Sequence, residues 1–573
     1  MRKIPYLIAA LLLVAGARAF ACTNVIVTKA ASADGSCMVS YAADSHSLFG
    51  ELYFRKAADH KPGEMLRITE WDTSKPLGEI PQAAHTFQTV GNMNEHQLII
   101  GETTWGGRWE QVDTTGIMDY GSLIYITLQR AVTAREAIQT IVSLANEYGY
   151  PSGGETFSIA DREEAWVMDL VGKGPDNKGI VWVARRIPDG YVCAHANQAR
   201  ITRFPQNDPE NCLFAPDVIS FAREKGWFNG ADADFSFRDA YNPLDFGGAR
   251  ACDARAWSAF NILCDGQFTW EENGKEKSRP AAGWLNYAMG YDLTGEMPLF
   301  VKPSRKISVK DVADVMRDHF EGTPMDMTTD IGAGGNALPY RWRPMNFAWE
   351  GKTYCNERAI ATQQTGFWFV AQARGWLPDT IGALIWFGCD DAATSYLTPI
   401  YVNTKKVPEC LREGNGSILK YSPTSQFWVC NRVANACYRM YNCMAPFVRK
   451  AVDAFENDQI FNRVPEIDNL LLSVYNGRSG RHPGRRGAVR RVIRGLTNYT
   501  VETAQNQFAE WVKLEETLLV KFIDGNVKAQ NEDGSFRHTE YSGSIPDGLE
   551  QPGYTDKWKE AVARDHGSVI EVR

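Results

Sequence analysis

Alternating apolar and polar residues predict β-strands from about residue 24 onward. The alternation runs over 24–28, breaks at Ala33-Asp34-Gly35 and resumes over 37–41, which is the pattern of a β-hairpin. Residues 122–149 place apolar residues at helical spacing and end at a glycine. Further strand patterns occupy 96–104, 155–170, 179–187, 190–197, TGFWFVAQAR and TIGALIWFG. Strands, helices and again strands to about residue 402 predict two packed sheets with helical cover.

Beyond about residue 420 the apolar spacing becomes that of long amphipathic helices, over 431–459 and 500–525. Between them lies the arginine-rich stretch 477–495. Its arginines are Arg478, Arg481, Arg485, Arg486, Arg490, Arg491 and Arg494. The stretch lacks interleaved aromatic residues, and the whole chain is negatively charged. A solvated loop or a sequence irregularity is therefore favoured over a nucleic-acid or surface-binding patch.

The first 21 residues have the form of a secretory signal peptide. Arg2 and Lys3 precede an apolar stretch over 6–14, and Ala19-Phe20-Ala21 is a small-x-small cleavage pattern. The apolar stretch is too short to span a membrane stably, and no later run of about 18 apolar residues qualifies. The sequence thus predicts a soluble mature protein, periplasmic or secreted, without stable membrane insertion.

The remaining length divides into two expected regions, a catalytic domain over 22–410 and a mainly helical region over 411–573. Hydrophobic residues make up 44% of the chain and charged residues 23%, so an ordered globular core is expected. The net charge of -8 gives no general attraction to nucleic acid or anionic lipid. The oligomeric state stays open, a homo-oligomer included.

The 12 cysteines are too sparse to form a disulfide scaffold, and none belongs to a CxxC pair. Cys389, within an apolar run, is predicted to be a buried thiol. Cys430, Cys437 and Cys443 are either bridged or spaced along a helix. No histidine cluster at ligand spacing accompanies them, which argues against a zinc site.

Cleavage after Ala21 would make Cys22 the first residue of the mature chain. An α-amine has a pKa of about 7.7–8.0 and a thiol about 8.5, so one residue could supply both nucleophile and base. The alternative is a lipoprotein anchored through Cys22. Its machinery usually requires Leu three residues before the cysteine, where this chain has Ala19, and Phe20 is too bulky for the next position.

The mature N-terminus resembles a known family. CTNVIVTKAASADGS and YAADSH are similar to the opening of the C69 peptidases, the dipeptidase family of cysteine-dependent N-terminal nucleophile (Ntn) hydrolases. NMNEHQLIIGETT, GGETFSIADREEAWVMDLVG, AHANQARI, FVAQARGWLPDTIGALIWFG and YLTPIY resemble family segments in the family's order. These segments cover residues 22–402.

The resemblance implies an α+β fold, a four-layer αββα sandwich of the Ntn hydrolase type with a helical C-terminal region. It also implies roles for individual residues. Cys22 would be the nucleophile, and Asp44 would orient the N-terminal residue and the substrate. Asn197 would be the side-chain donor of the oxyanion hole, Thr104 falls where the second donor lies, and Arg255 matches an active-site arginine. One position departs from the family, because Tyr41 stands where an arginine is common.

Two further choices concern the substrate and the base. A substrate with a free amino group needs a carboxylate partner, for which Asp44, Glu102 and Asp169 are candidates, with Asp44 preferred. His46 and His195 lie beside the motifs, but an N-terminal amine makes a papain-like histidine base unnecessary.

The expected activity is hydrolysis of dipeptides or short peptides through a thioester acyl-enzyme, with no metal or organic cofactor. One alternative is a non-peptide amidase of the penicillin- or bile-salt-acylase type. The other is a non-catalytic protein anchored to lipid through Cys22.

Overall fold

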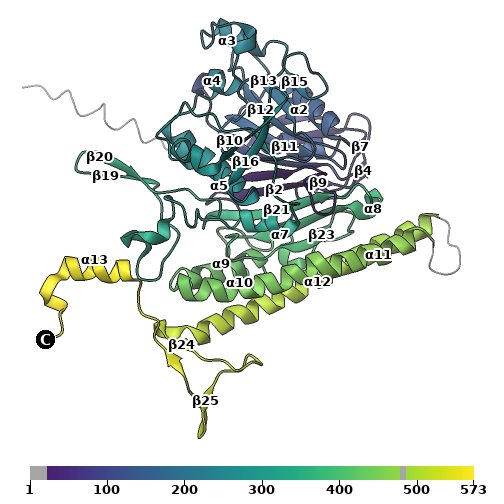
Figure 1. Cartoon of the computed structure of the whole chain (residues 1–573). Helices are drawn as coiled ribbons and strands as arrows, with labels where there is room; N and C mark the ends of the chain where they lie inside the picture. Colours follow the sequence, from purple (N-terminus) through teal and green to yellow (C-terminus); the bar gives the residue numbers. More distant parts are fainter. Residues whose placement is uncertain (1–21, 478–484) are drawn as a thin grey trace, which may run out of the picture.

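The computed structural model describes residues 22–477 and 485–573, and it contains both helices and β-sheets (Figure 1). This mixture confirms the predicted α+β class. The leader and the arginines Arg478 and Arg481 lie outside the described residues. Within the described part, no helix is both long enough and apolar enough to cross a membrane.

The first sheet has seven antiparallel strands and contains the N-terminal hairpin. In sheet order they are β18 (Phe300–Val301), β14 (Val192–His195), β1 (Asn24–Val27), β2 (Cys37–Asp44), β21 (Thr365–Ala373), β22 (Ala383–Cys389) and β23 (Thr398–Tyr401). The predicted hairpin is confirmed, since β1 pairs with β2 and Ile26 lies opposite Val39. β1 therefore lies inside the sheet, between β14 and β2.

The second sheet has eight antiparallel strands. In order they are β15 (Cys212–Phe214), β13 (Ile180–Arg186), β12 (Ala165–Gly172), β11 (Gly154–Ala160), β10 (Ile99–Trp105), β9 (Met93–Asn94), β8 (Thr89–Val90) and β3 (Phe54–Arg55). The strands predicted over 96–104, 155–170 and 179–187 are β10 to β13 of this sheet. Successive strands are sequence neighbours from β8 to β13, so this sheet is assembled mainly from local connections.

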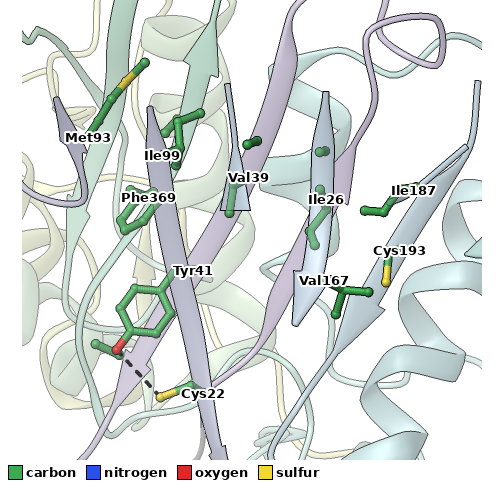
Figure 2. Close-up of a cluster of buried hydrophobic side chains, with 14 of the residues drawn as sticks. Cys22, Ile26, Val39, Tyr41, Met93, Ile99, Val167, Ile187, Cys193 and Phe369 are labelled. Atoms are coloured by element: carbon green, nitrogen blue, oxygen red, sulfur yellow. Dashed lines mark hydrogen bonds between the residues drawn. The ribbon is translucent and has the colours of Figure 1, made fainter. Parts of the chain in front are cut away.

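The two sheets pack face to face through a continuous apolar layer. Ile26 and Val39 enter it from the first sheet, and Ile99 and Val167 from the second, all with no exposed surface (Figure 2). Burying one such side chain stabilises the fold by about 1.5–3 kcal/mol. Cys22 belongs to the same cluster, so the predicted nucleophile lies in the layer between the sheets.

Helices cover the outer faces of both sheets. α1 (Tyr120–Leu128) and α2 (Ala134–Tyr148) pack on the second sheet. The helical spacing predicted over 122–149 corresponds to these two helices, because the chain leaves the helix before Thr133. The Thr133 side chain accepts a hydrogen bond from the Glu136 backbone N–H, and the Glu136 carboxylate accepts one from the Thr133 backbone N–H. This capping box begins a new helix.

The outer face of the first sheet is covered by α5 (Ala254–Leu263) and α7 (Val309–Val315), together with α11 (Val464–Tyr475) and part of α12 (Arg485–Lys521). α9 (Gln426–Cys437) and α10 (Tyr441–Asp458) pack with the remainder of α12 in a separate apolar cluster. Figure 1 shows these long helices running alongside one another next to β23. The helix predicted over 431–459 is divided in two, because α9 ends at Cys437 and α10 begins at Tyr441. The helix predicted over 500–525 is confirmed to Lys521 as the C-terminal part of α12.

The arginine-rich stretch is helical over 485–494, where a loop was predicted. Ala488, Val492 and Leu496 are buried at intervals of four residues, and their packing holds this part of the chain in a helix. The exposed arginines of this helical segment face the solvent. They are Arg486, Arg490, Arg491 and Arg494.

The cysteines form no disulfide, and all of them lie in the described part of the chain. Cys389 is buried, as predicted, with its thiol directed at the Gly50 carbonyl oxygen. Cys430 and Cys437 lie on α9 and Cys443 lies on α10, so the helix alternative for this group is the one observed.

The remaining elements are short. The helices are α3 (Val218–Glu224), α4 (Phe237–Tyr241), α6 (Leu285–Ala288), α8 (Asp379–Gly382) and α13 (Asp556–His566). The two-stranded pairs are β4 (Ala58–Asp59) with β7 (His85–Thr86), β5 (Met65–Thr69) with β6 (Pro76–Pro81), β16 (Gln267–Glu272) with β17 (Lys275–Pro280), β19 (Asn346–Trp349) with β20 (Lys352–Cys355), β24 (Val527–Lys528) with β27 (Leu549–Glu550), and β25 (His538–Thr539) with β26 (Ser542–Pro546).

A buried ion pair fastens α10 to the segment after α7. Arg317 donates to both carboxylate oxygens of Glu456, at 3.0 and 2.5 Å, and Glu456 has no exposed surface. Replacing Glu456 by Gln leaves the buried Arg317 guanidinium with only its longer ion pair, of 3.5 Å to the partly exposed Asp314, among the described residues. We expect the free energy of unfolding to fall by about 3–5 kcal/mol in urea titrations. The control is Glu510→Gln, which breaks an exposed pair with Lys513 and is expected to cost less than about 1 kcal/mol.

Candidate active site

Cys22 is held at the start of a central strand. Thr23 forms a bridge with Ala42 of β2, and β1 begins at the next residue. The Cys22 carbonyl oxygen accepts a hydrogen bond of 2.6 Å from Nη1 of Arg255. With the backbone held on both sides, the Cys22 side chain has a defined direction and is only 3% exposed.

A phenol and a carboxyl group contact the Cys22 sulfur. It lies 3.8 Å from the Tyr41 hydroxyl (Figure 2) and 3.6 Å from Oε1 of Glu102. Burial raises the pKa of the thiol well above its usual value, and the charges of Glu102 and Asp44 raise it further. The backbone N–H of Asp44 and the Tyr41 hydroxyl act in the opposite direction. The thiol is therefore protonated at rest, and attack requires a base.

Tyr41 and Glu102 form a second contact at this point. The Tyr41 hydroxyl donates to Oε1 of Glu102 at 2.5 Å. Behind them, the Thr104 hydroxyl donates to Glu155 at 2.8 Å. Burial, followed by the charge of Glu102, raises the pKa of Glu155 well above its usual value, which favours its protonated form. A phenol and buried carboxyl groups thus occupy the region beside the thiol where the family commonly has an arginine.

Arg255 connects the predicted oxyanion donor to the predicted nucleophile. Besides the Cys22 carbonyl, it donates through Nη1 to the Thr23 hydroxyl at 2.8 Å and through Nη2 to Oδ1 of Asn197 at 2.8 Å. Nδ2 of Asn197 donates to the Thr104 carbonyl oxygen at 2.6 Å. Burial lowers the pKa of Arg255 to about 10, so it remains a cation near neutral pH.

Asn197 adopts the left-handed conformation, with φ 46. Asparagine tolerates this region better than most residues. Its amide nitrogen carries two hydrogens, so one remains for a ligand after the bond to Thr104. The Thr104 hydroxyl is already used on Glu155, which leaves Asn197 as the better-placed donor of the two.

Asp44 lies at the end of β2, and its carboxylate has no exposed surface. Oδ2 accepts from Arg358 at 2.5 Å and Oδ1 accepts from the Thr365 hydroxyl at 2.7 Å. Burial raises the pKa of Asp44, and Arg358 is the largest influence that opposes this rise. Arg358 was not identified from the sequence, because no local pattern relates it to a residue 314 positions away.

Two other sequence candidates, His195 and Asp169, lie in closed hydrogen-bond networks, whereas His46 is exposed. His195 is fully buried, with Nδ1 at 2.7 Å from the Thr103 hydroxyl and Nε2 at 2.7 Å from the Ser158 hydroxyl. Burial lowers the pKa of His195 to about 3, and burial also lowers that of His46. Asp169 accepts hydrogen bonds from the Thr156 hydroxyl and from two backbone N–H groups after β14, those of residues 200 and 201. These contacts indicate that His195 and Asp169 have structural roles.

A cavity of about 940 Å³ opens beside these residues. Thr104, Asn197, Arg255 and Arg358 contribute to its wall. The hairpin of β19 and β20, which projects from the body of the molecule in Figure 1, supplies part of the rim. Aromatic side chains add apolar surface. They are Trp105, Tyr120, Phe246 and Tyr354. Over the described residues, no group of His, Cys, Asp and Glu side chains has the arrangement of a metal site.

Comparisons with known proteins agree with the N-terminal motifs. The model of peptidase family C69 matches residues 21–454. A probable dipeptidase from Salmonella dublin is 25% identical over 418 residues, which cover 69% of this chain and 84% of that protein. A probable dipeptidase from Latilactobacillus sakei is 23% identical, covering 69% and 76%. A dipeptidase from Bifidobacterium longum is 22% identical, covering 73% and 77%. The chain belongs to peptidase family C69.

Proposed function

We propose that this protein is a periplasmic or secreted dipeptidase of the N-terminal nucleophile type, activated by removal of residues 1–21. The catalytic unit would span 22–410, an αββα sandwich, with 411–573 as a helical addition. The substrates would be dipeptides or short peptides, in line with the names of the related proteins. No metal or organic cofactor takes part in the proposed reaction.

The observation that supports this function most is the position of Arg255. One buried guanidinium binds both the Cys22 carbonyl oxygen and the side chain of Asn197. Nucleophile and oxyanion donor are therefore fixed relative to each other before substrate arrives. Such preorganisation is the main requirement for stabilising a tetrahedral oxyanion.

In the proposed reaction, the α-amine of mature Cys22 removes the thiol proton, and the sulfur attacks the scissile carbonyl carbon. Asn197 donates its remaining N–H to the oxyanion. The protonated amine then returns its proton to the leaving nitrogen, which releases the C-terminal residue and leaves a thioester. Water, deprotonated by the same amine, hydrolyses the thioester. Asp44, held by Arg358, would orient the N-terminal residue through the contact of its backbone N–H with the sulfur.

Before cleavage, the nitrogen of Cys22 is a peptide amide, which is no base near neutral pH. We therefore expect dipeptide hydrolysis only from the processed form. Intact mass and N-terminal sequencing of exported protein, combined with a dipeptide hydrolysis assay, test this expectation. A chain beginning at Cys22 that hydrolyses dipeptides is the expected result. An unprocessed chain with the same turnover would contradict the mechanism.

The same experiment separates the two alternatives. Turnover of an N-acylated amide, with none of free dipeptides, would indicate a penicillin- or bile-salt-type acylase. A mature mass increased by a lipid on Cys22, without hydrolysis of any amide, would indicate an anchored non-catalytic protein.

A further inference from the structure

The cavity beside Cys22 carries charges of both signs. Its charged lining residues are Glu70, Asp72, Arg250, Arg255, Arg343 and Arg358. The acidic residues belong to the segment between β5 and β6. The arginines come from the start of α5 and its preceding turn, and from the segments flanking the β19–β20 hairpin. The two signs are thus supplied by separate parts of the fold.

Most of these charges already have protein partners. Arg250 forms an ion pair of 2.5 Å with Glu357, and Arg358 forms one with Asp44. Arg255 directs its donors to Cys22, Thr23, Asn197 and the Ala251 carbonyl. Glu70 accepts a hydrogen bond from the Thr73 hydroxyl. These residues hold the walls of the cavity together.

Asp72 has no ion pair with any residue in the described ranges. Oδ1 accepts from the Tyr120 hydroxyl at 2.8 Å, and Oδ2 has no hydrogen bond there. Burial raises the pKa of Asp72 to about 6, and the charge of Glu102 adds to this effect. Glu102 itself also lacks a cation among the described residues and lies 3.6 Å from the Cys22 sulfur. A cation bound at Asp72 would offset the repulsion between Asp72 and Glu102.

Arg343 is a cation without an anionic partner among the described residues. Nε and Nη2 both donate to Oε1 of Gln364, at 3.0 and 2.6 Å, and Nη1 has no acceptor among the described residues. Burial lowers the pKa of Arg343 to about 10, and the charge of Arg358 lowers it further. An anion bound at Arg343 would offset both effects, and Nη1 would supply a donor to it.

A free dipeptide has the matching charge pattern. Its α-ammonium and α-carboxylate groups are at most about 7 Å apart, with the scissile amide between them. The ammonium nitrogen is two bonds from the carbonyl carbon, which must approach the sulfur to about 3–3.5 Å. It therefore has to lie close to Cys22, on the side where Glu102 is found. The carboxylate belongs to the leaving residue and points away from that side.

We propose that Asp72 and Arg343 anchor the two ends of a zwitterionic dipeptide. Asp72 binds the α-ammonium group, with the charge of Glu102 adding to the attraction, and Arg343 binds the α-carboxylate. This assignment rests on the proposed dipeptidase function. It also accounts for substrate length, because a longer peptide presents a neutral amide where Arg343 would bind a carboxylate.

Three substrates test the two anchors separately: alanylalanine, N-acetyl-alanylalanine and alanylalaninamide. For Asp72→Asn, we expect kcat/KM on alanylalanine to fall about 10- to 100-fold, mainly through KM, so that discrimination against the N-acetylated form collapses. For Arg343→Gln, we expect a similar fall, with loss of discrimination against the amide. Arg343→Lys should restore part of it. Glu510→Gln, which breaks an exposed ion pair on α12 outside the cavity lining, is the control and should keep both preferences.

Binding provides a second measurement that is independent of turnover. In a Cys22→Ala background, calorimetric titration with alanylalanine should show that either Asp72→Asn or Arg343→Gln raises Kd by about tenfold or more. Equal binding by all forms would overturn the anchors. A loss of kcat/KM that is equal for all three substrates would also overturn the anchors. If the enzyme still hydrolyses dipeptides in that case, the proposed function stands. A wild-type enzyme without dipeptide turnover would instead contradict the proposed function.

Discussion

Replacing Cys22 by alanine is expected to lower kcat on dipeptides by at least about 10⁴-fold, because it removes the sulfur that forms the proposed thioester. His195 has both ring nitrogens engaged with hydroxyl groups, so it is not placed to act as a base in place of the Cys22 amine. The loss should appear in kcat, with substrate binding retained. Steady-state kinetics on purified mature protein measure it, and intact mass must show cleavage at the same position.

The matched control is Cys443→Ala. Cys443 is a partly exposed thiol on α10, far from the cavity in the fold, and its replacement should change kcat by less than about twofold. Correctly processed Cys22→Ala protein with full activity would contradict the nucleophile assignment. If the Cys22→Ala protein does not unfold cooperatively, its binding of alanylalanine is the measurement that tests whether the cavity is intact.

Replacing Asn197 by aspartate is expected to lower kcat about 10²- to 10³-fold with little change in KM. The substitution keeps the shape of the side chain and the tolerance for the left-handed backbone, and Oδ1 can still accept from Arg255. It removes both amide hydrogens, the one donated to the Thr104 carbonyl oxygen and the one proposed to reach the oxyanion. The effect on the transition state is measured by kcat, and the effect of losing the bond to Thr104 is measured by the melting temperature.

Asn273→Asp is the control for this change. Asn273 has a similar φ of 52 but lies in the exposed turn between β16 and β17, so the same chemical change should leave kcat unaltered. An unchanged melting temperature for Asn197→Asp would confirm that the backbone is maintained. If its kcat equalled that of the wild type, Asn197 would not be the oxyanion donor.

Local patterns were sufficient for the strands and for most helices. The β1–β2 hairpin was predicted correctly because alternation with period two and a turn at Ala33-Asp34-Gly35 are properties of neighbouring residues. The start of α2 also has a local signal, a threonine at 133 followed three residues later by Glu136, which is the pattern of a capping box. The helix over 485–494 was missed because its arginines obscure the buried positions at Ala488 and Val492.

The chemistry beside Cys22 was predicted only in part. The position of Cys22 after a signal-like leader suggested a nucleophile that carries its own base, and the family resemblance suggested Asn197 and Arg255. It was not evident that Arg255 would bind the backbone of Cys22, or that Glu102 and Tyr41 would adjoin the sulfur. The pKa of the thiol, expected near its ordinary value, is raised because the residue is buried between the sheets.

The α+β class, the N-terminal hairpin, the helical C-terminal region and the candidate nucleophile could be predicted, since each depends on residues close together in the chain. Which charged groups meet depends on the tertiary structure. Asp44 with Arg358, and Asp72 with Arg343 around one cavity, come from distant segments of the sequence. Electrostatic partners are selected by packing, and packing of separate segments leaves no periodic pattern along a single chain.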